Sequence, residues 1–122
     1  MQDTSHSKHD DIFERLMEIS QETFVSGNYE TAYHALAAAM HYAKDLGDDE
    51  RLAGVEHAAK AQQDQIDTHA PKHWMSRQSA VRRHVTSLYD MLARQASAHV
   101  LIIQQEQRRE HTKRLAWPDD AK

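Results

Sequence analysis

The 122-residue sequence contains no cysteine, only three glycines and only two prolines. Without cysteine, the chain has no disulfide framework, no thiolate metal site and no thiol nucleophile. Three glycines are too few for a loop that cradles phosphates, and no serine lies in the glycine elbow of a serine hydrolase. We therefore expect a protein that is not an enzyme and that binds no cofactor.

Long apolar runs are also absent. No stretch approaches the ~20 apolar residues that a membrane-spanning helix needs. The polar start of the chain, MQDTSHSKHDD, lacks the apolar core of a signal peptide. We expect a soluble, cytoplasmic protein with no membrane contact, built as a single helical domain over residues 11–117. A flexible N-terminus (1–10) and a flexible tail (118–122) are expected to flank this domain.

Helical periodicity runs through the chain, because apolar residues recur at three- and four-residue steps. Turn and capping signals divide this pattern at Gly27-Asn28, at Gly47-Asp48, and between Pro71 and Ser76. The expected helices span residues 11–26, 28–46, 49–68 and 76–115. This predicts an all-α fold, an antiparallel helical array or four-helix bundle with a long C-terminal helix. That helix is expected either to overhang the bundle, to bend near Ala96-Ser97, or to pair with another chain.

The third expected helix carries two unusual features. Gln62 interrupts its apolar stripe, so it either forms a hydrogen bond across the bundle or lies at the wet end of the bundle. Gly54, Ala58 and Ala61 form a ridge almost without side chains, which we expect to lie against the alanines of the second helix.

The alanine-rich segment after the first turn resembles a known repeat. Gly27-Asn28-Tyr29, followed by Ala32, Leu36 and Ala39-Met40, resembles the turn and second helix of a tetratricopeptide repeat. The resemblance covers one repeat, about residues 11–44. The first helix departs from the family pattern: Leu16, Ile19-Ser20 and Thr23-Phe24 stand where the family has Trp, Leu-Gly and Tyr, and Lys44 replaces the terminal proline. The resemblance implies a scaffold that binds other proteins.

Charge is divided unevenly along the chain. Residues 1–67 carry five Lys or Arg and fourteen Asp or Glu (−9), whereas residues 68–122 carry ten and five (+5), giving the net charge of −4. One interpretation is an acidic hairpin docked on a basic helix within the bundle. The alternative is a basic surface held free for nucleic acid or an acidic partner. The basic residues of this alternative form two clusters: Arg77, Arg82, Arg83 and His84 in one, and Arg108, Arg109, His111, Lys113 and Arg114 of the long helix in the other.

The ten histidines suggest a metal site as a third hypothesis. His34 and His41 lie seven residues apart on one face of the second helix, and His57 of the third helix could complete a set of ligands. The chain has no HExxH or ExxH motif, so we expect no metal and regard these three histidines as the only candidate ligands.

Four consecutive aliphatic residues, Val100 to Ile103, occur late in the long helix. Their side chains wrap most of the way around a helix, so one neighbouring hairpin can bury only part of them. We therefore expect a homodimer through this segment, with Leu101 and Ile103 in the interface.

The favoured function is a non-catalytic protein–protein interaction or adaptor module. Its expected partner-binding residues are Arg77, Arg82, Arg83, Leu101 and Ile103.

Overall fold

The computed structural model describes residues 4–116, and this part of the chain forms five helices and no strand. The helices are α1 (Thr4–Val25), α2 (Tyr29–Asp45), α3 (Asp49–His69), α4 (Arg77–Arg82) and α5 (Leu88–Ala116). The predicted all-α array with a long C-terminal helix is thus confirmed. The predicted tail 118–122 lies outside the described residues.

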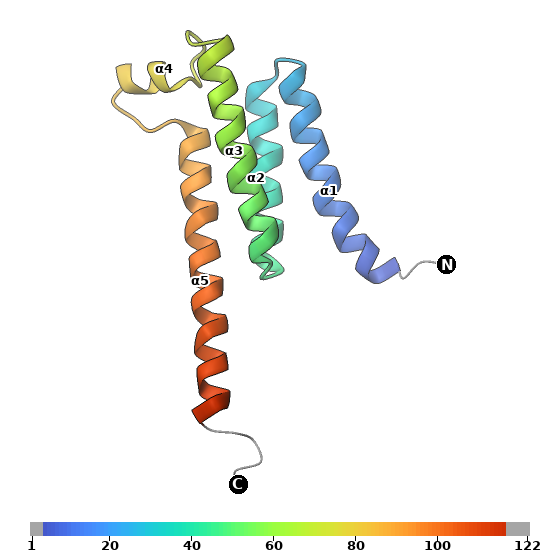
Figure 1. Cartoon of the computed structure of the whole chain (residues 1–122). Coiled ribbons are helices and arrows are strands. Elements are labelled where there is room, and N and C mark those ends of the chain that lie inside the picture. Colours follow the sequence, from blue (N-terminus) through green and yellow to red (C-terminus); the bar gives the residue numbers. More distant parts are fainter. Residues whose placement is uncertain (1–3, 117–122) are drawn as a thin grey trace.

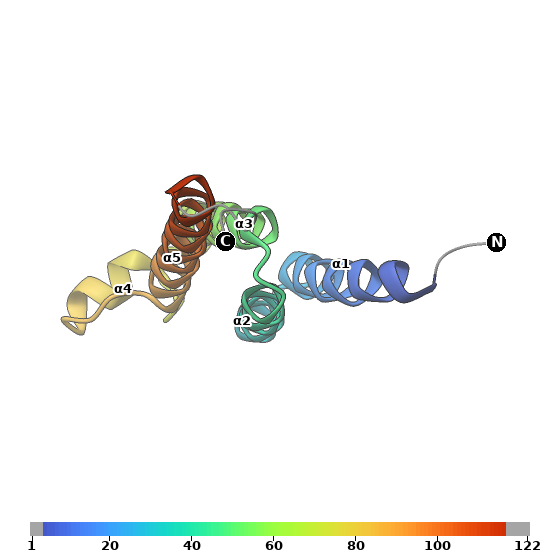
Figure 2. The same cartoon turned by 90° about the horizontal axis from the view of Figure 1, so that it is seen from below.

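The four long helices stand side by side, and short α4 lies beside one end of them (Figure 1). Viewed from below, α1 and α5 occupy opposite sides, with α2 and α3 between them (Figure 2). Contacts follow the chain order: α1 packs on α2, α2 on α3, and α3 along α5. The chain is therefore an array of helical hairpins in which α1 and α5 have partners mainly on one side.

Two similar turns join the first three helices. Gly27 and Gly47 have φ angles of +87° and +64°, a left-handed conformation that glycine adopts without a steric penalty. In the first turn the N–H of Asn28 donates to Thr23 O (2.8 Å), and in the second the N–H of Asp48 donates to Ala43 O (3.0 Å). The Asp48 side chain also caps α3 by accepting from the N–H of Arg51 (3.0 Å). Both turns and the Asp48 cap are confirmed, whereas the Asn28 side chain makes no capping hydrogen bond to α2.

Small residues of α2 form the centre of the core. Ala32, Ala39 and Ala43 are fully buried, which brings α2 close to its neighbours. An aromatic cluster closes one end, where Tyr89 of α5 lies edge-on to Phe24 of α1 and Tyr33 of α2. The Tyr89 hydroxyl donates to Tyr29 O (2.9 Å), and burial of the phenol raises its pKa well above the usual range.

The uninterrupted helix predicted from residue 76 to residue 115 is wrong in its first part. The chain leaves the helix after Arg82 and re-enters it at Leu88, whereas α5 continues without a break through Ala96 and Ser97. Ser87 ends the break: its Oγ accepts from the N–H of Asp90 (3.2 Å) and donates to the buried Gln63 Oε1 (2.7 Å). Ser87 with Asp90 is a helix-capping pattern visible in the sequence. The helical spacing of apolar residues continues across this position, and it therefore predicted one unbroken helix.

Two further expectations need correction. Helix α1 begins at Thr4, seven residues before the expected start at residue 11. The ridge of small residues on α3 does not pack against α2, because Gly54 and Ala61 are exposed and Ala58 is only partly buried. The faces of α3 that do pack carry Leu52, Val55, Ala59 and Ile66. No helix in the described part of the chain is both long and apolar enough to cross a membrane.

Candidate functional site

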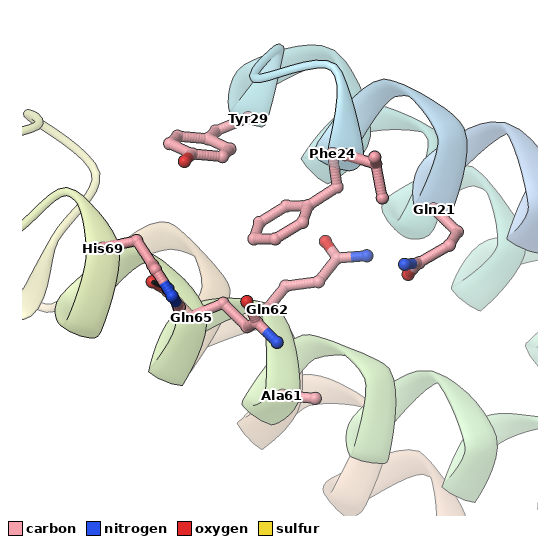
Figure 3. A pocket seen from close by; sticks show the side chains of 8 residues that line it. Gln21, Phe24, Tyr29, Ala61, Gln62, Gln65 and His69 are labelled. Carbon is pink, nitrogen blue, oxygen red and sulfur yellow. Dashed lines mark hydrogen bonds between the residues drawn. The ribbon is translucent and has the colours of Figure 1, made fainter.

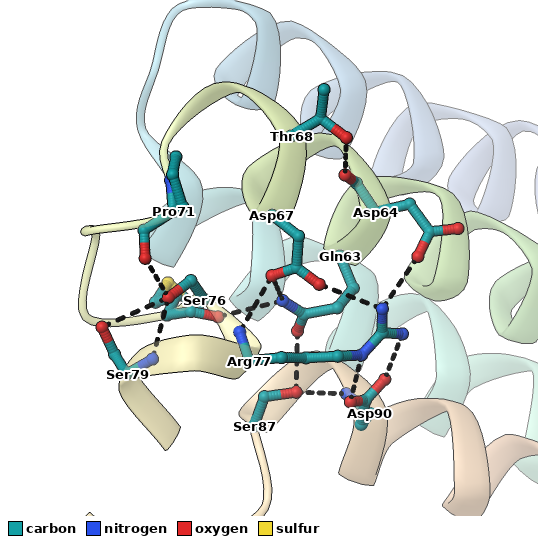
Figure 4. A network of polar contacts seen from close by, with 11 residues as sticks. Gln63, Asp64, Asp67, Thr68, Pro71, Ser76, Arg77, Ser79, Ser87 and Asp90 are labelled. Carbon is teal, nitrogen blue, oxygen red and sulfur yellow. Dashed lines mark hydrogen bonds and ion pairs between the residues drawn. The ribbon is translucent and has the colours of Figure 1, made fainter. Parts of the chain in front are cut away.

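The first predicted partner-binding residue, Arg77, is engaged within the molecule (Figure 4). Its guanidinium group binds Asp90 of α5 in a bidentate manner, with Nε to Oδ2 at 2.8 Å and Nη2 to Oδ1 at 2.9 Å. Nη1 donates to Asp64 and Asp67 of α3 at 2.9 and 3.0 Å. Hydrogen bonding to Arg77 holds the pKa of the Asp90 carboxyl below its usual range. Arg77 thus ties α4 to α3 and α5 and is not a free cation.

The other two predicted arginines have different surroundings. Arg83 donates from Nη2 to Trp74 O (2.7 Å), and its guanidinium carbon lies 6.0 Å from the centre of the Trp74 ring. Arg82 is exposed on α4. The structure therefore places the three arginines near one another but leaves only Arg82 without a role inside the fold. A basic surface built on all three is weaker than the sequence indicates.

The two predicted aliphatic contacts point in different directions. Leu101 is 60% exposed and lines a groove between α3 and α5, whereas Ile103 is partly buried against the core. The side chain next to Leu101, Ile102, is 50% exposed. The exposed aliphatic pair is therefore Leu101 and Ile102, and not Leu101 and Ile103.

The three candidate metal ligands lie on the surface. His34, His41 and His57 are all exposed, and the nearest acidic partner of His34 is Glu30 at 3.8 Å. Within the part of the chain that the structure describes, no three His, Asp or Glu side chains come together in a way that could hold a metal ion.

A groove of about 340 Å³ lies between α1 and α3, near the aromatic end of the core (Figure 3). The α1 wall is formed by the last turns of that helix, and the α3 wall by its second half. Tyr29, at the start of α2, closes the end. The lining side chains are Gln21, Phe24, Val25, Tyr29, Ala61, Gln62, Gln65 and His69.

Gln62 is the residue that connects this groove to the core. Its Nε2 donates to Ser20 Oγ of α1 (3.1 Å), so it forms the bond across the bundle that is one of the two expectations for this residue. The residue is 5% exposed, yet no described residue donates a hydrogen bond to its Oε1. Buried amide oxygens are usually paired, so an unpaired one beside a groove is unusual.

The sequence singles out Gln62 but not the groove. Gln21 and Gln65 read as ordinary surface glutamines, and Ser20 lies among apolar residues of the first helix. No local pattern indicates that α1 and α3 face each other, because that depends on the angle at which two hairpins pack.

Comparisons of the chain with protein-family models, with curated proteins and with solved structures find no match. The resemblance of residues 11–44 to a tetratricopeptide repeat therefore stays a prediction.

Proposed function

We propose that this protein is a non-catalytic interaction module that binds a partner protein on its helical surface, at the groove between α1 and α3. The observation that supports this proposal is the groove itself, which is lined by apolar rings and amide side chains and includes Gln62, whose buried Oε1 is unpaired. A concave surface with apolar contacts and a few convergent polar groups is the usual form of a binding site.

The competing function, nucleic-acid binding, has less support. Binding to phosphates depends on free Lys and Arg side chains. Arg77 is held by three aspartates, and Arg83 is bonded to Trp74 O. The second basic cluster, on α5, is exposed: Arg108, Arg109, Lys113 and Arg114. We therefore retain nucleic acid as an outcome that the experiment below must exclude.

Two valines of nearly equal exposure provide a matched test of the proposal. Val25 lines the groove and is 73% exposed, whereas Val81 lies on α4 and is 72% exposed. Each is replaced in turn by a photo-crosslinking amino acid in the full-length protein. Proteins that crosslink to the Val25 variant but not to the Val81 variant are then purified. Their binding to the protein without the crosslinking residue is measured by calorimetric titration.

We expect at least one purified protein to bind with a defined stoichiometry and to suppress crosslinking from Val25. The proposal is wrong if no purified candidate binds. It is also wrong if the chain instead retains labelled nucleic acid with an affinity that falls steeply as salt rises.

We further propose that a second copy of the chain covers the exposed side of α5. Figure 1 shows α5 extending beyond the ends of the other helices, and every residue from 105 to 116 is exposed. Leu101 and Ile102 are the large aliphatic residues exposed just before this overhang. Because each side chain is already partly covered, burying both on association stabilises a dimer by on the order of 1 kcal/mol for each side chain.

A further inference from the structure

The orientation of the Gln62 amide is determined by a chain of hydrogen bonds. Ser20 Oγ donates to Ala32 O (2.8 Å), and a carbonyl oxygen can only accept. A hydroxyl has one hydrogen, so Ser20 Oγ must act as the acceptor toward Gln62. Gln62 therefore turns its NH₂ group to Ser20, at 3.1 Å, and its Oε1 away from it. This series of hydrogen bonds fixes the orientation of the amide and leaves its oxygen as the unpaired acceptor.

The groove beside this acceptor is lined by aromatic, amide and small side chains, together with His69. Among the described residues that line it, none is Asp, Glu, Lys or Arg. Phe24, Val25 and Tyr29 supply apolar surface, while Gln21 and Gln65 each offer both a donor and an acceptor. A charged ligand would lose much of its hydration here and would find no carboxylate, Lys or Arg in the lining to pair with. The lining thus favours a ligand that is uncharged and that carries both N–H and C=O groups.

We propose that the groove binds an extended, uncharged peptide segment of the partner protein, with a backbone N–H donating to Gln62 Oε1. This inference rests on the proposed function and names the chemistry of its ligand. A peptide backbone presents one donor and one acceptor per residue, which matches an acceptor at Gln62 flanked by the amides of Gln21 and Gln65. An apolar side chain of the segment packs against Phe24 and Tyr29, whose ring centres lie 4.8 Å apart.

Access to the acceptor requires a small rearrangement. Gln62 Oε1 is buried, whereas the rim residues Gln21 and Gln65 are exposed. Rotamer changes of such side chains are common when a partner binds. We expect binding to open the acceptor by such a rotamer change, with the helices left in place.

The experiment uses random peptides displayed on phage and selected on the full-length protein, followed by titration of the synthetic winners by fluorescence anisotropy. We expect winning segments without Lys, Arg, Asp or Glu, whose affinity is unchanged between low and high salt. Winners that require charged residues, or whose affinity depends steeply on salt, overturn the inference.

Two alanines of α3 locate the site. Ala61 lines the groove and Ala53 does not, and both are exposed, so a long side chain at either position leaves the core intact. We expect Ala61→Arg to weaken peptide binding by at least about tenfold and Ala53→Arg to leave it unchanged. Equal affinities for the two variants mean that the peptide binds elsewhere, and the inference fails.

Gln62→Met tests the acceptor, because Met is close in length to Gln and lacks the amide. We expect about tenfold weaker peptide binding from the lost hydrogen bond. In the unsubstituted protein, added peptide should also shift the NMR signals of the Gln62 side-chain NH₂ group, which a purely structural Gln62 would not show. Unchanged affinity in Gln62→Met, or unshifted signals, overturns the assignment of this acceptor.

Failure of this inference is distinguishable from failure of the proposed function. If a purified partner protein binds and protects Val25 while the peptides are charged or insensitive to Ala61→Arg, the interaction module stands and the ligand chemistry is wrong. If neither a partner protein nor any peptide binds the full-length chain, both proposals are wrong.

Discussion

At the scale of single residues, the ion pairs of Arg77 can be tested with a matched control. It joins α4 to Asp64 and Asp67 of α3 and to Asp90 of α5. Its side chain is 44% exposed, so solvent screening reduces the value of each ion pair. We predict that Arg77→Gln lowers the free energy of unfolding by about 1–2 kcal/mol, measured by urea denaturation.

The control for this prediction is Arg82→Gln. Arg82 lies on the same short helix and is exposed. Its replacement should change the free energy of unfolding by less than about 0.5 kcal/mol. Equal losses in the two variants would show that the Arg77 network contributes nothing specific.

His99 gives the fold a pH dependence at the scale of one residue. Desolvation, together with Lys44 and His41 of α2, lowers its pKa below the usual 6.5. The unfolded chain therefore binds a proton at this residue more readily than the folded chain. We predict that stability falls as the pH drops through about 6.5 and levels off below the lowered pKa.

His99→Gln should remove this part of the pH dependence, measured as the urea midpoint between neutral and mildly acidic pH. His57→Gln, which changes an exposed histidine on α3, is the control and should keep the dependence. A His99→Gln variant with the unaltered pH slope would contradict the assignment.

At the scale of the elements, three helices are each followed, two positions after their last residue, by a residue with positive φ. Two of these residues are Gly27 and Gly47, and the third is His84 after α4, with φ of +58°. A non-glycine residue in this conformation costs roughly 1–2 kcal/mol. We predict that His84→Gly raises the free energy of unfolding by about 1 kcal/mol, and that Gly47→Ala lowers it by a similar amount, measured by thermal or urea unfolding.

Gly54 supplies the control for these substitutions. It lies inside α3, and a Cβ added there meets no atom within 4 Å. Gly54→Ala should therefore stabilise α3 by about 0.5–1 kcal/mol, because alanine favours the helix interior. A Cβ at Gly47 also meets no atom within 4 Å, so any loss in Gly47→Ala comes from the backbone and not from a clash.

At the scale of the whole molecule, the testable feature is self-association through α5. The helix has 29 residues and is about 43 Å long, so its last part has no neighbour within the described bundle. We predict a dimer at micromolar concentration in analytical ultracentrifugation, and a monomer after Leu101→Glu with Ile102→Glu, because two carboxylates from each chain would be buried in the interface.

The matched control is Gln107→Glu with His111→Glu, which adds two acidic residues on the side of α5 that carries Ile103. Both positions are exposed, so the fold should tolerate them. A dimer that survives the first pair but not the second would place the interface on the Ile103 side. A monomeric unsubstituted protein would exclude the dimer altogether.

Local signals in the sequence determined the helical elements and several of their ends. Gly27, Gly47, Asp48 and Ser76 act on backbone groups within one turn of themselves, so their roles do not depend on the rest of the fold. The three- and four-residue periodicity likewise predicts an all-α array. It also identifies Leu36, Leu52 and Val55 as core residues.

Only the tertiary structure decided how these helices meet and which polar groups pair. Ser20 bonds Gln62 across 42 residues, and Ser87 bonds Gln63 across 24, so no local pattern specifies either pair. At the break before α5, the second pair adds to the local cap that Ser87 forms, since Gln63 lies fully buried and Ser87 supplies a donor to its oxygen. The angle between the α1–α2 and α3–α5 hairpins sets the groove, and with it the unpaired Gln62 oxygen. Packing between distant residues determines that angle, because helices that read alike in sequence pack at different angles.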